Sequence, residues 1–232
     1  MIITDIRQEL KNKIDSEYKE REGSFSKEEY QSYGVRTPKV RETAKKFWKQ
    51  VKSEQKSEIF AKCQQLLDSE MSEEQTVAFS WAYRLKSRLT PDDLDVFYQW
   101  LKTYVDTWFK CDDFCSHAVG YLLYKYPQLS TEVLEWAGSD NRWLRRAAAV
   151  SLLYSLRREE QLDLAFRVAD KLLLDEDDLV QKGYGWMLKE ATKHWPNQVF
   201  QFVLERKDRM PRTALRYAIE KLPDDQRQQA MS

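Results

Sequence analysis

Apolar residues recur along most of the chain at intervals of three and four, the spacing that places them on one face of an α-helix. The 232 residues include only six Gly and six Pro, which leaves few positions for hairpin turns. The pattern therefore predicts an all-α protein with about a dozen helices, most of roughly 10 to 18 residues, joined by short turns.

Several helix starts carry their own signals. Thr37 and Pro38 offer an N-cap followed by a proline in the first turn, and Ser72 to Gln75 (SEEQ) match a capping box. Thr90 to Asp93 (TPDD) combine a cap, a proline and an acidic first turn. Ser130 and Asp140 are further predicted N-caps. These signals divide the chain into short helices.

Weak internal similarity points to a repeat. The segments 143–153 and 180–190 align with each other, and 211–222 resembles both. Short helices that recur in pairs every roughly 30 to 45 residues are typical of a solenoid, in which one helix of each pair lines a concave surface. We expect one domain over residues 1–232, a right-handed solenoid of helical pairs with a concave groove. An irregular helical bundle is the alternative.

The composition of the chain bears on its cellular compartment more than on its function. Lys and Arg number 38, as do Asp and Glu, so the formal net charge is zero and only local clusters bear on a polyanionic partner. The three cysteines, Cys63, Cys111 and Cys115, do not form a disulfide framework, and the chain opens without an apolar signal segment. No apolar run approaches the roughly 20 residues of a membrane span. We expect a soluble, monomeric, cytoplasmic protein.

Two local clusters are basic. Residues 140–158 hold five arginines, including Arg145 and Arg146, and residues 206–216 hold five basic residues, including Arg212 and Arg216. Such an excess suits phosphate binding, although a solvated helix face is the commoner explanation of any one cluster. Arg36, with Lys39, precedes or begins a predicted helix, where backbone amides also bind phosphate. The ordinary helix start is the favoured interpretation there.

Catalytic groups are few. His117 and His194 are the only histidines, and no set of side chains has metal-ligand spacing, so we expect neither a metal nor a cofactor. Cys111 and Cys115 are four residues apart and are expected in the core. Trp108 and Asp112 are also four apart, and therefore neighbours on one helical face. A carboxylate beside an indole is suited to stabilising positive charge.

Taken in order, the segments TWFKCDDFC (107–115), SDNRWLRRAAAVSLL (139–153) and QKGYGWMLKEATKHWP (181–196) resemble the DNA alkylation repair proteins, alkylpurine DNA glycosylases built from HEAT-like helical repeats. The resemblance extends from YGVRTPKVR, near residue 33, to RTALRYAIEKL, which ends at Leu222. It implies a HEAT-like solenoid whose basic groove holds duplex DNA.

The resemblance also implies site residues. The catalytic aspartate corresponds to Asp112, four residues after Trp108, and the second tryptophan to Trp186. Arg146 corresponds to the arginine that holds backbone phosphate near the lesion. Further DNA contacts are expected from other basic residues, namely Arg145, Arg36, Lys182, Arg212 and Arg216. The family's glycosylases carry an N-terminal helix with aromatic contacts to the duplex, whereas residues 19–34 here are polar and interrupted by glycine.

The function expected first is a monofunctional DNA glycosylase that excises cationic N3- and N7-alkylated purines by hydrolysis. Neither Lys110 nor Lys182 lies in a context typical of an imine-forming amine, so no lyase step is expected. A noncatalytic DNA-structure-binding protein on the same scaffold is the first alternative. A protein-interaction scaffold, whose groove would be apolar or acidic, is the second.

Overall fold

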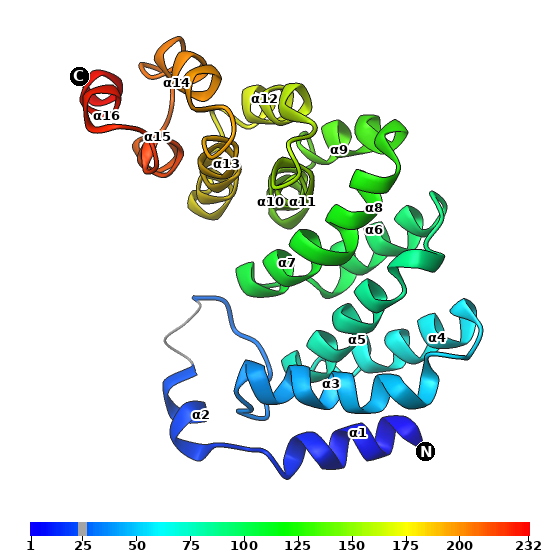
Figure 1. The fold of residues 1–232 in the computed structure, drawn as a ribbon. Helices are drawn as coiled ribbons and strands as arrows, with labels where there is room; N and C mark the ends of the chain where they lie inside the picture. Colours follow the sequence, from blue (N-terminus) through cyan, green and yellow to red (C-terminus); the bar gives the residue numbers. More distant parts are fainter. Residues whose placement is uncertain (23–26) are drawn as a thin grey trace. The chain divides into compact units, whose positions relative to one another are not determined.

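The structure is a computed structural model that describes residues 1–22 and 27–232, and over these ranges it is helical (Figure 1). No strand occurs among the described residues, where Gln31 and Met71 form one isolated parallel bridge. The predicted all-α class is therefore confirmed. Part of the polar segment 19–34, residues 23–26, lies outside the described residues. No helix in the described part of the chain is long and apolar enough to cross a membrane.

Contacts divide the chain into two compact units, residues 1–114 and 115–232. Helices α3 and α4 both pack against α5 in the first unit, and α5 also contacts α7. The helices of this unit are, in order, α1 (Ile2–Lys11), α2 (Ser16–Glu22), α3 (Thr37–Val51), α4 (Lys56–Leu67), α5 (Ser72–Arg84), the 3-10 turn η1 (Lys86–Arg88), α6 (Asp93–Tyr104) and α7 (Trp108–Phe114).

In the second unit, α13 is the central helix, because it contacts α10, α12 and, most extensively, α15. Its helical segments are the π-turn η2 (Cys115–Val119), α8 (Gly120–Lys125), the 3-10 turn η3 (Pro127–Leu129), α9 (Ser130–Trp136), α10 (Arg142–Val150), α11 (Leu153–Leu156), α12 (Leu162–Lys171), α13 (Asp178–Ala191), α14 (Pro196–Leu204), α15 (Arg212–Ile219) and α16 (Asp224–Met231). One domain with a solenoid arrangement stays a prediction.

Aromatic residues supply much of the core of the first unit. Phe79 of α5 stacks on Phe114 at the end of α7, with ring centroids 4.4 Å apart. Trp81 is fully buried, and its indole nitrogen donates to the carbonyl of Ala44, so its one polar atom is satisfied. The three cysteines are free thiols and all buried, which confirms the core positions predicted for Cys111 and Cys115. The last turn of α7 is thereby anchored in this core.

The predicted capping box at Ser72 is wrong. Helix α5 does begin at Ser72, but Met71 is its N-cap residue and makes no side-chain cap. The Gln75 side chain, which a capping box would direct to the N-cap amide, donates instead to the carbonyl of Leu67 at 3.2 Å. The two acids between them bind other segments: Glu74 accepts from Arg7 and Tyr33, and Glu73 accepts from the chain around Gly34.

Other helix starts are shifted by one or two residues; the N-caps of α3 and α9 are Arg36 and Leu129 rather than Thr37 and Ser130. Helix α6 begins at Asp93 rather than near Pro91, and the Asp93 carboxylate accepts the amide of Thr90 at 2.7 Å. Helix α10 is capped by Asn141, not by Asp140, because the Asn141 side chain accepts from the amide of Trp143 at 2.8 Å. Such boundaries are the least predictable part of a helix.

Candidate functional site

Helix α7 presents the candidate carboxylate. Its buried residues are Lys110, Cys111 and Phe114, whereas Trp108 and Asp112 are half-buried. Because Trp108 and Asp112 lie one turn apart, they share a face of the helix. The next residue, Asp113, is ion-paired with Arg41 of α3, with Nη2 and Oδ1 3.3 Å apart. One residue further along a helix turns a side chain by about 100°, so Asp113 does not share the face of Trp108.

Lys110 is the amine nearest to Asp112 in sequence, and it is not accessible. Its side chain is 1% exposed, and its Nζ lies 2.7 Å from Oδ1 of Asp106. Immediately after α7 comes the π-turn η2, which contains Cys115 and His117. π-turns within helices are frequent at functional sites, and no signal in the sequence identifies this one.

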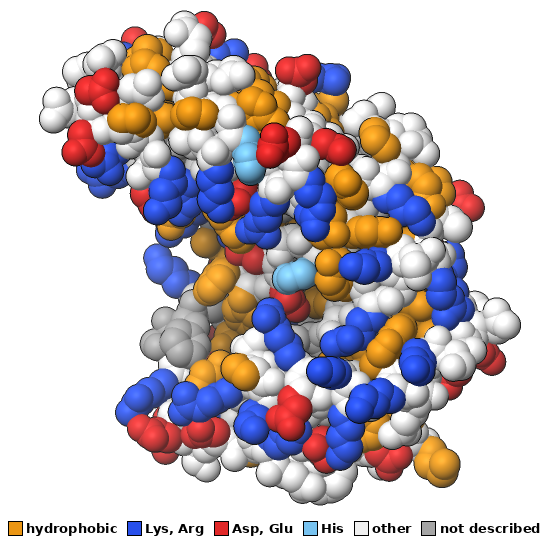
Figure 2. All heavy atoms as spheres, viewed as in Figure 1, with side chains coloured by type: hydrophobic (Ala, Val, Ile, Leu, Met, Phe, Trp, Pro, Cys, Tyr) orange, Lys and Arg blue, Asp and Glu red, His pale blue; other side chains and the backbone are white. Residues whose placement is uncertain are grey.

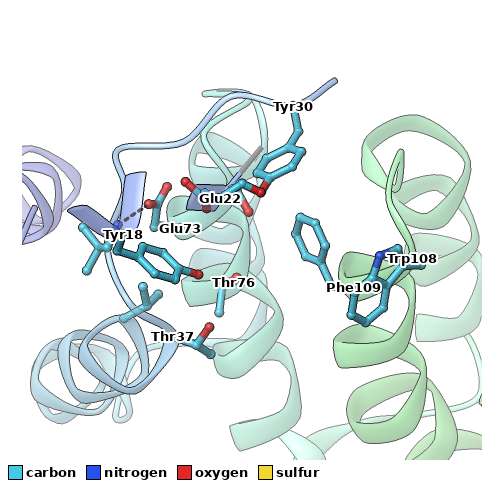
Figure 3. A pocket seen from close by; sticks show the side chains of 11 residues that line it. Tyr18, Glu22, Tyr30, Thr37, Glu73, Thr76, Trp108 and Phe109 are labelled. Carbon is cyan, nitrogen blue, oxygen red and sulfur yellow. Dashed lines mark hydrogen bonds between the residues drawn. The ribbon is translucent and has the colours of Figure 1, made fainter. Parts of the chain in front are cut away.

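A cavity of about 230 Å³ adjoins Trp108 on the first unit (Figure 3). Four aromatic rings line it: Trp108 and Phe109 from α7, Tyr18 from α2, and Tyr30 from the segment before α3. The carboxyl groups of Glu22 and Glu73 also line it, and both residues are buried. Sequence reasoning did not find this cavity, because its residues come from segments far apart in the chain.

Burial governs the ionisable groups of this cavity. Loss of solvent around Glu22 raises its pKa, and the nearby Glu73 acts in the same direction, against the hydrogen bond from Ser32. Burial, followed by the Glu22 charge, raises the pKa of the Tyr30 phenol. Its hydroxyl donates to the backbone carbonyl of Glu22 at 3.2 Å. The cavity wall is therefore a poor place for additional negative charge.

Glu73 fixes the wall formed by residues 32–35. Its Oε1 accepts from the Ser32 hydroxyl and from the amides of Gly34 and Val35, each at 2.9 Å, and its Oε2 accepts from the amide of Tyr33 at 3.0 Å. Gly34 has a φ of 86°, a conformation that favours glycine. One buried carboxylate thus holds the turn that leads into α3.

Arg36 stands at the start of α3, as predicted for a phosphate contact, but its guanidinium has partners within the protein. Its Nε lies 2.7 Å from Oδ2 of Asp15, and its side chain stacks 5.3 Å from the ring centre of Tyr18. Both Arg36 and Asp15 are partly exposed. Lys39 similarly pairs with Glu42 at 3.3 Å. A phosphate at this position would have to compete with these acids.

Two predicted DNA contacts of α10, Arg145 and Arg146, tie that helix to the start of α13. The Arg145 side chain, 21% exposed, pairs with the buried carboxylate of Asp175 at 2.6 Å and also donates to the carbonyls of Ser139 and Asp140. Arg146 is 5% exposed and donates through Nη1 to the carbonyl of Leu179 in the first turn of α13. Within this unit both arginines therefore join helices.

Helix α13 carries Trp186, which is half-buried. Two glycines of the same helix, Gly183 and Gly185, lie at close contacts with neighbouring helices. A Cβ at Gly183 would lie 3.2 Å from Cγ of Arg146. A Cβ at Gly185 would lie 2.6 Å from Cβ of Tyr217 and 2.9 Å from the carbonyl oxygen of Ala214, both in α15. The two glycines thus permit α10 and α15 to approach α13 on either side of Trp186.

Helix α15 presents the most available cations among the predicted DNA contacts. Arg212 and Arg216 are exposed and one turn apart, and within the described chain neither has a hydrogen bond or an ion pair. Lys182 of α13 pairs with Asp178 at 2.6 Å, but 36% and 59% of these side chains are exposed, so solvent weakens the pair. Basic side chains also occur widely over the face shown in Figure 2.

The predicted site residues thus fall into two groups. Trp108 and Asp112 share α7 in the first unit, and Arg146, Trp186, Lys182, Arg212 and Arg216 occupy contacting helices of the second. The meeting of these two groups at one point stays a prediction. No group of three acids, histidines or cysteines suited to a metal ion occurs in the described part of the chain.

Comparison with known proteins adds two matches. The model of a family described as DNA alkylation repair enzyme matches residues 6–222. Among solved structures, the chain is similar to a predicted DNA alkylation repair enzyme from Enterococcus faecalis, with a TM-score of 0.82 and 19% identity over 91% of this chain and 98% of the other. At this identity the likeness concerns the fold. No curated protein matches the chain.

Proposed function

This chain belongs to the DNA alkylation repair enzyme family, and we propose that it is a monofunctional DNA glycosylase that excises cationic N3- and N7-alkylated purines from duplex DNA. The observation that carries the proposal is the pair on α7: Asp112 shares a half-buried face of the helix with Trp108. A partly desolvated carboxylate next to an indole suits a reaction that develops positive charge.

The chemistry follows from the charge of the lesion. Alkylation at N3 or N7 makes the purine cationic, so the base leaves with the electron pair of the N-glycosidic bond and becomes neutral without being protonated. No general acid is required for departure, which agrees with the scarcity of histidine. The sugar carbon C1′ gains the positive charge of an oxocarbenium ion as this bond breaks.

Asp112 would act on that sugar cation. Its carboxylate stabilises the charge at C1′ and orients a water molecule, whose oxygen forms the new bond to C1′ while its proton is released through the carboxylate to solvent. Trp108 and Trp186 add the attraction of indole faces for a cation. The buried Lys110, paired with Asp106, offers no amine for a lyase step.

The proposed arrangement is a HEAT-like solenoid of one domain whose groove holds the duplex. In it Trp108, Asp112, Arg146 and Trp186 converge on the lesion sugar. Arg212 and Arg216 supply phosphate contacts, since they are exposed and unpaired among the described residues. Such contacts release counterions from DNA, so the affinity of the proposed monomer for duplex DNA should fall steeply as salt is raised.

The test is single-turnover excision from a duplex with one 7-methylguanine. Asp112→Asn retains the shape of the side chain but loses its charge, and we expect excision to slow by about 10²-fold, on the order of 3 kcal/mol, with DNA binding nearly unchanged. Asp113→Asn is the matched control. It removes the Arg41 pair and points about 100° away along the helix, so it should change the rate little.

Full activity of the Asp112→Asn variant would overturn the assignment of the carboxylate. A wild-type protein that binds the duplex but releases no cationic base would instead identify the noncatalytic DNA-binding alternative. A protein that binds no DNA at low salt would contradict both and favour the protein-interaction scaffold.

A further inference from the structure

The indole of Trp108 is the first side chain of α7, and the helix backbone does little to orient it. Side chains of a helix tilt toward its N-terminus and rest on the turn that precedes their own Cα. Trp108 opens the seven-residue helix α7, so no turn of that helix precedes it. Its side chain is half-buried. The orientation of the indole therefore depends on the side chains that pack around it.

A pair of ring contacts joins the indole to a distant segment. Phe109 meets Trp108 edge to face, with centroids 5.7 Å apart and an interplanar angle of 87°. Tyr30 in turn meets Phe109 at 5.0 Å and 71°. Figure 3 shows the Phe109 ring between Tyr30 and Trp108. Edge-to-face pairs stabilise a structure beyond the burial of their surface, so the position of Tyr30 bears through Phe109 on the position of the indole.

Tyr30 itself is anchored through its side chain and its backbone. Its hydroxyl donates to the backbone carbonyl of Glu22 at 3.2 Å. Burial raises the pKa of the Glu22 carboxyl group, and side-chain hydrogen bonds from Ser32 and Tyr30 oppose that rise. The next residue, Gln31, accepts the amide of Ser72 at 2.9 Å through its carbonyl. Tyr30 is thus fixed to the start of α5, the helix that also packs against α7.

We propose that Tyr30 and Phe109 are positioning residues, which hold the Trp108 indole toward the lesion sugar in the reaction proposed above, on which this inference rests. Catalysis depends steeply on placement, so an indole that turns away from the sugar no longer stabilises its charge. Neither Tyr30 nor Phe109 has to touch the DNA for this role. The polar segment 19–34 thereby contributes to the site through the one ring of Tyr30.

The kinetic test is single-turnover excision of 7-methylguanine from a duplex over a range of enzyme concentrations. Tyr30→Leu should lower the maximal rate about fivefold, the factor that loss of one aromatic pair predicts, and leave the half-saturating concentration within about twofold. Tyr30→Phe keeps the ring and should retain at least about half of the wild-type rate. Once Trp108 is replaced by Leu, adding Tyr30→Leu should slow excision no further, since no indole remains to be held.

A second readout does not depend on excision. In protein labelled with 5-fluorotryptophan, the resonance that disappears in Trp108→Leu identifies Trp108 among the eight tryptophans. Tyr30→Leu should shift and sharpen this fluorine resonance, because the indole gains rotational freedom, and Tyr30→Phe should restore it. Phe109→Leu, which removes the ring between the two, should reproduce the effect of Tyr30→Leu. Circular dichroism confirms that each variant is folded.

Phe166→Leu is the matched control. It removes a half-buried ring of α12 that stacks on Phe202 of α14, with centroids 4.5 Å apart, in the second unit. The change should lower the midpoint of thermal unfolding, as the loss of any aromatic pair does. It should leave both the Trp108 resonance and the maximal rate unchanged.

An unchanged Trp108 resonance in both Tyr30→Leu and Phe109→Leu would overturn the proposal. So would equal losses of rate in Tyr30→Phe and Tyr30→Leu, or a further loss when Tyr30→Leu is added to Trp108→Leu, because Tyr30 would then act independently of the indole. Failure of the glycosylase proposal appears separately, as a wild-type protein that excises no base while Tyr30→Leu still shifts the Trp108 resonance. In that case Tyr30 holds the indole, and the reaction assigned to the indole is wrong.

Discussion

Two arginine pairs that look alike in the sequence, Arg145 with Arg146 and Arg212 with Arg216, are used differently in the structure. In the α10 pair, Arg145 is ion-paired with Asp175 and Arg146 donates to the Leu179 carbonyl, whereas the α15 pair is exposed and unpaired among the described residues. A basic cluster can therefore join helices or face solvent. Counting charges along the chain does not distinguish the two uses.

The difference arises from the neighbours of each helix. Helix α10 packs against α12 and α13, and the turn between these two carries Asp175 and Asp177, which pair with Arg145 and Arg142. Helix α15 packs its small residues, among them Ala214 and Ala218, against α13, and its arginines stay outside that contact. Whether a basic side chain stays exposed is therefore decided by which acids the tertiary contacts bring near it.

The largest expected effect is on stability, from Arg146→Ala. This change removes the donor to Leu179 and leaves a cavity under α13, so we expect the free energy of unfolding to fall by about 3 kcal/mol. Urea unfolding followed by circular dichroism measures it. The outcome that contradicts a helix-joining role is a variant as stable as the wild type that loses only affinity for DNA.

Gly185→Ala should have the next largest effect. The added Cβ would lie 2.6 Å from Cβ of Tyr217 and 2.9 Å from a backbone oxygen of α15, so the helices must separate, at a cost of about 2 kcal/mol. Gly183→Ala is the matched control, since the nearest atom to its new Cβ is Cγ of Arg146 at 3.2 Å, a less severe approach than at Gly185. Thermal unfolding compares the two; a larger loss in the Gly183 variant would contradict this account.

The smallest effect on stability, within about 0.5 kcal/mol, is expected from the double variant Arg212→Ala with Arg216→Ala. Its effect should appear in DNA binding instead. Removing two phosphate contacts should lower the slope of log affinity against log salt by about two. Fluorescence anisotropy over a range of salt concentrations measures this slope, and an unchanged slope would exclude both arginines from the interface.

The sequence predicts the helical class and the pair on α7 because both depend on local periodicity. Trp108 and Asp112 are four residues apart, and a helix through them necessarily places them on one face. The burial of Cys111 and Cys115 follows from the same reasoning. By contrast, the capping box predicted for Ser72 and Gln75 is wrong, since Met71 is the N-cap residue and the Gln75 side chain donates to the carbonyl of Leu67 in α4.

The cavity residues were missed for the same reason. Tyr18, Tyr30 and Phe109 have no shared spacing, and only the folded chain brings them to one place. The role of Arg145 was likewise hidden, because its partner Asp175 is thirty residues away. Local motifs can be recognised from a sequence, whereas the competition of distant groups for the same donors requires the structure.

The Glu73 carboxylate also has a consequence for how sequences of this family can diverge. Three of its four hydrogen bonds come from backbone amides, which every residue except proline supplies. The identity of the turn at residues 32–35 therefore rests on few positions: Glu73, Ser32 and Gly34, whose φ of 86° restricts replacement. We expect homologues either to keep these three residues or to replace all three together. Tyr33 and Val35 can vary as far as the packing of their side chains permits.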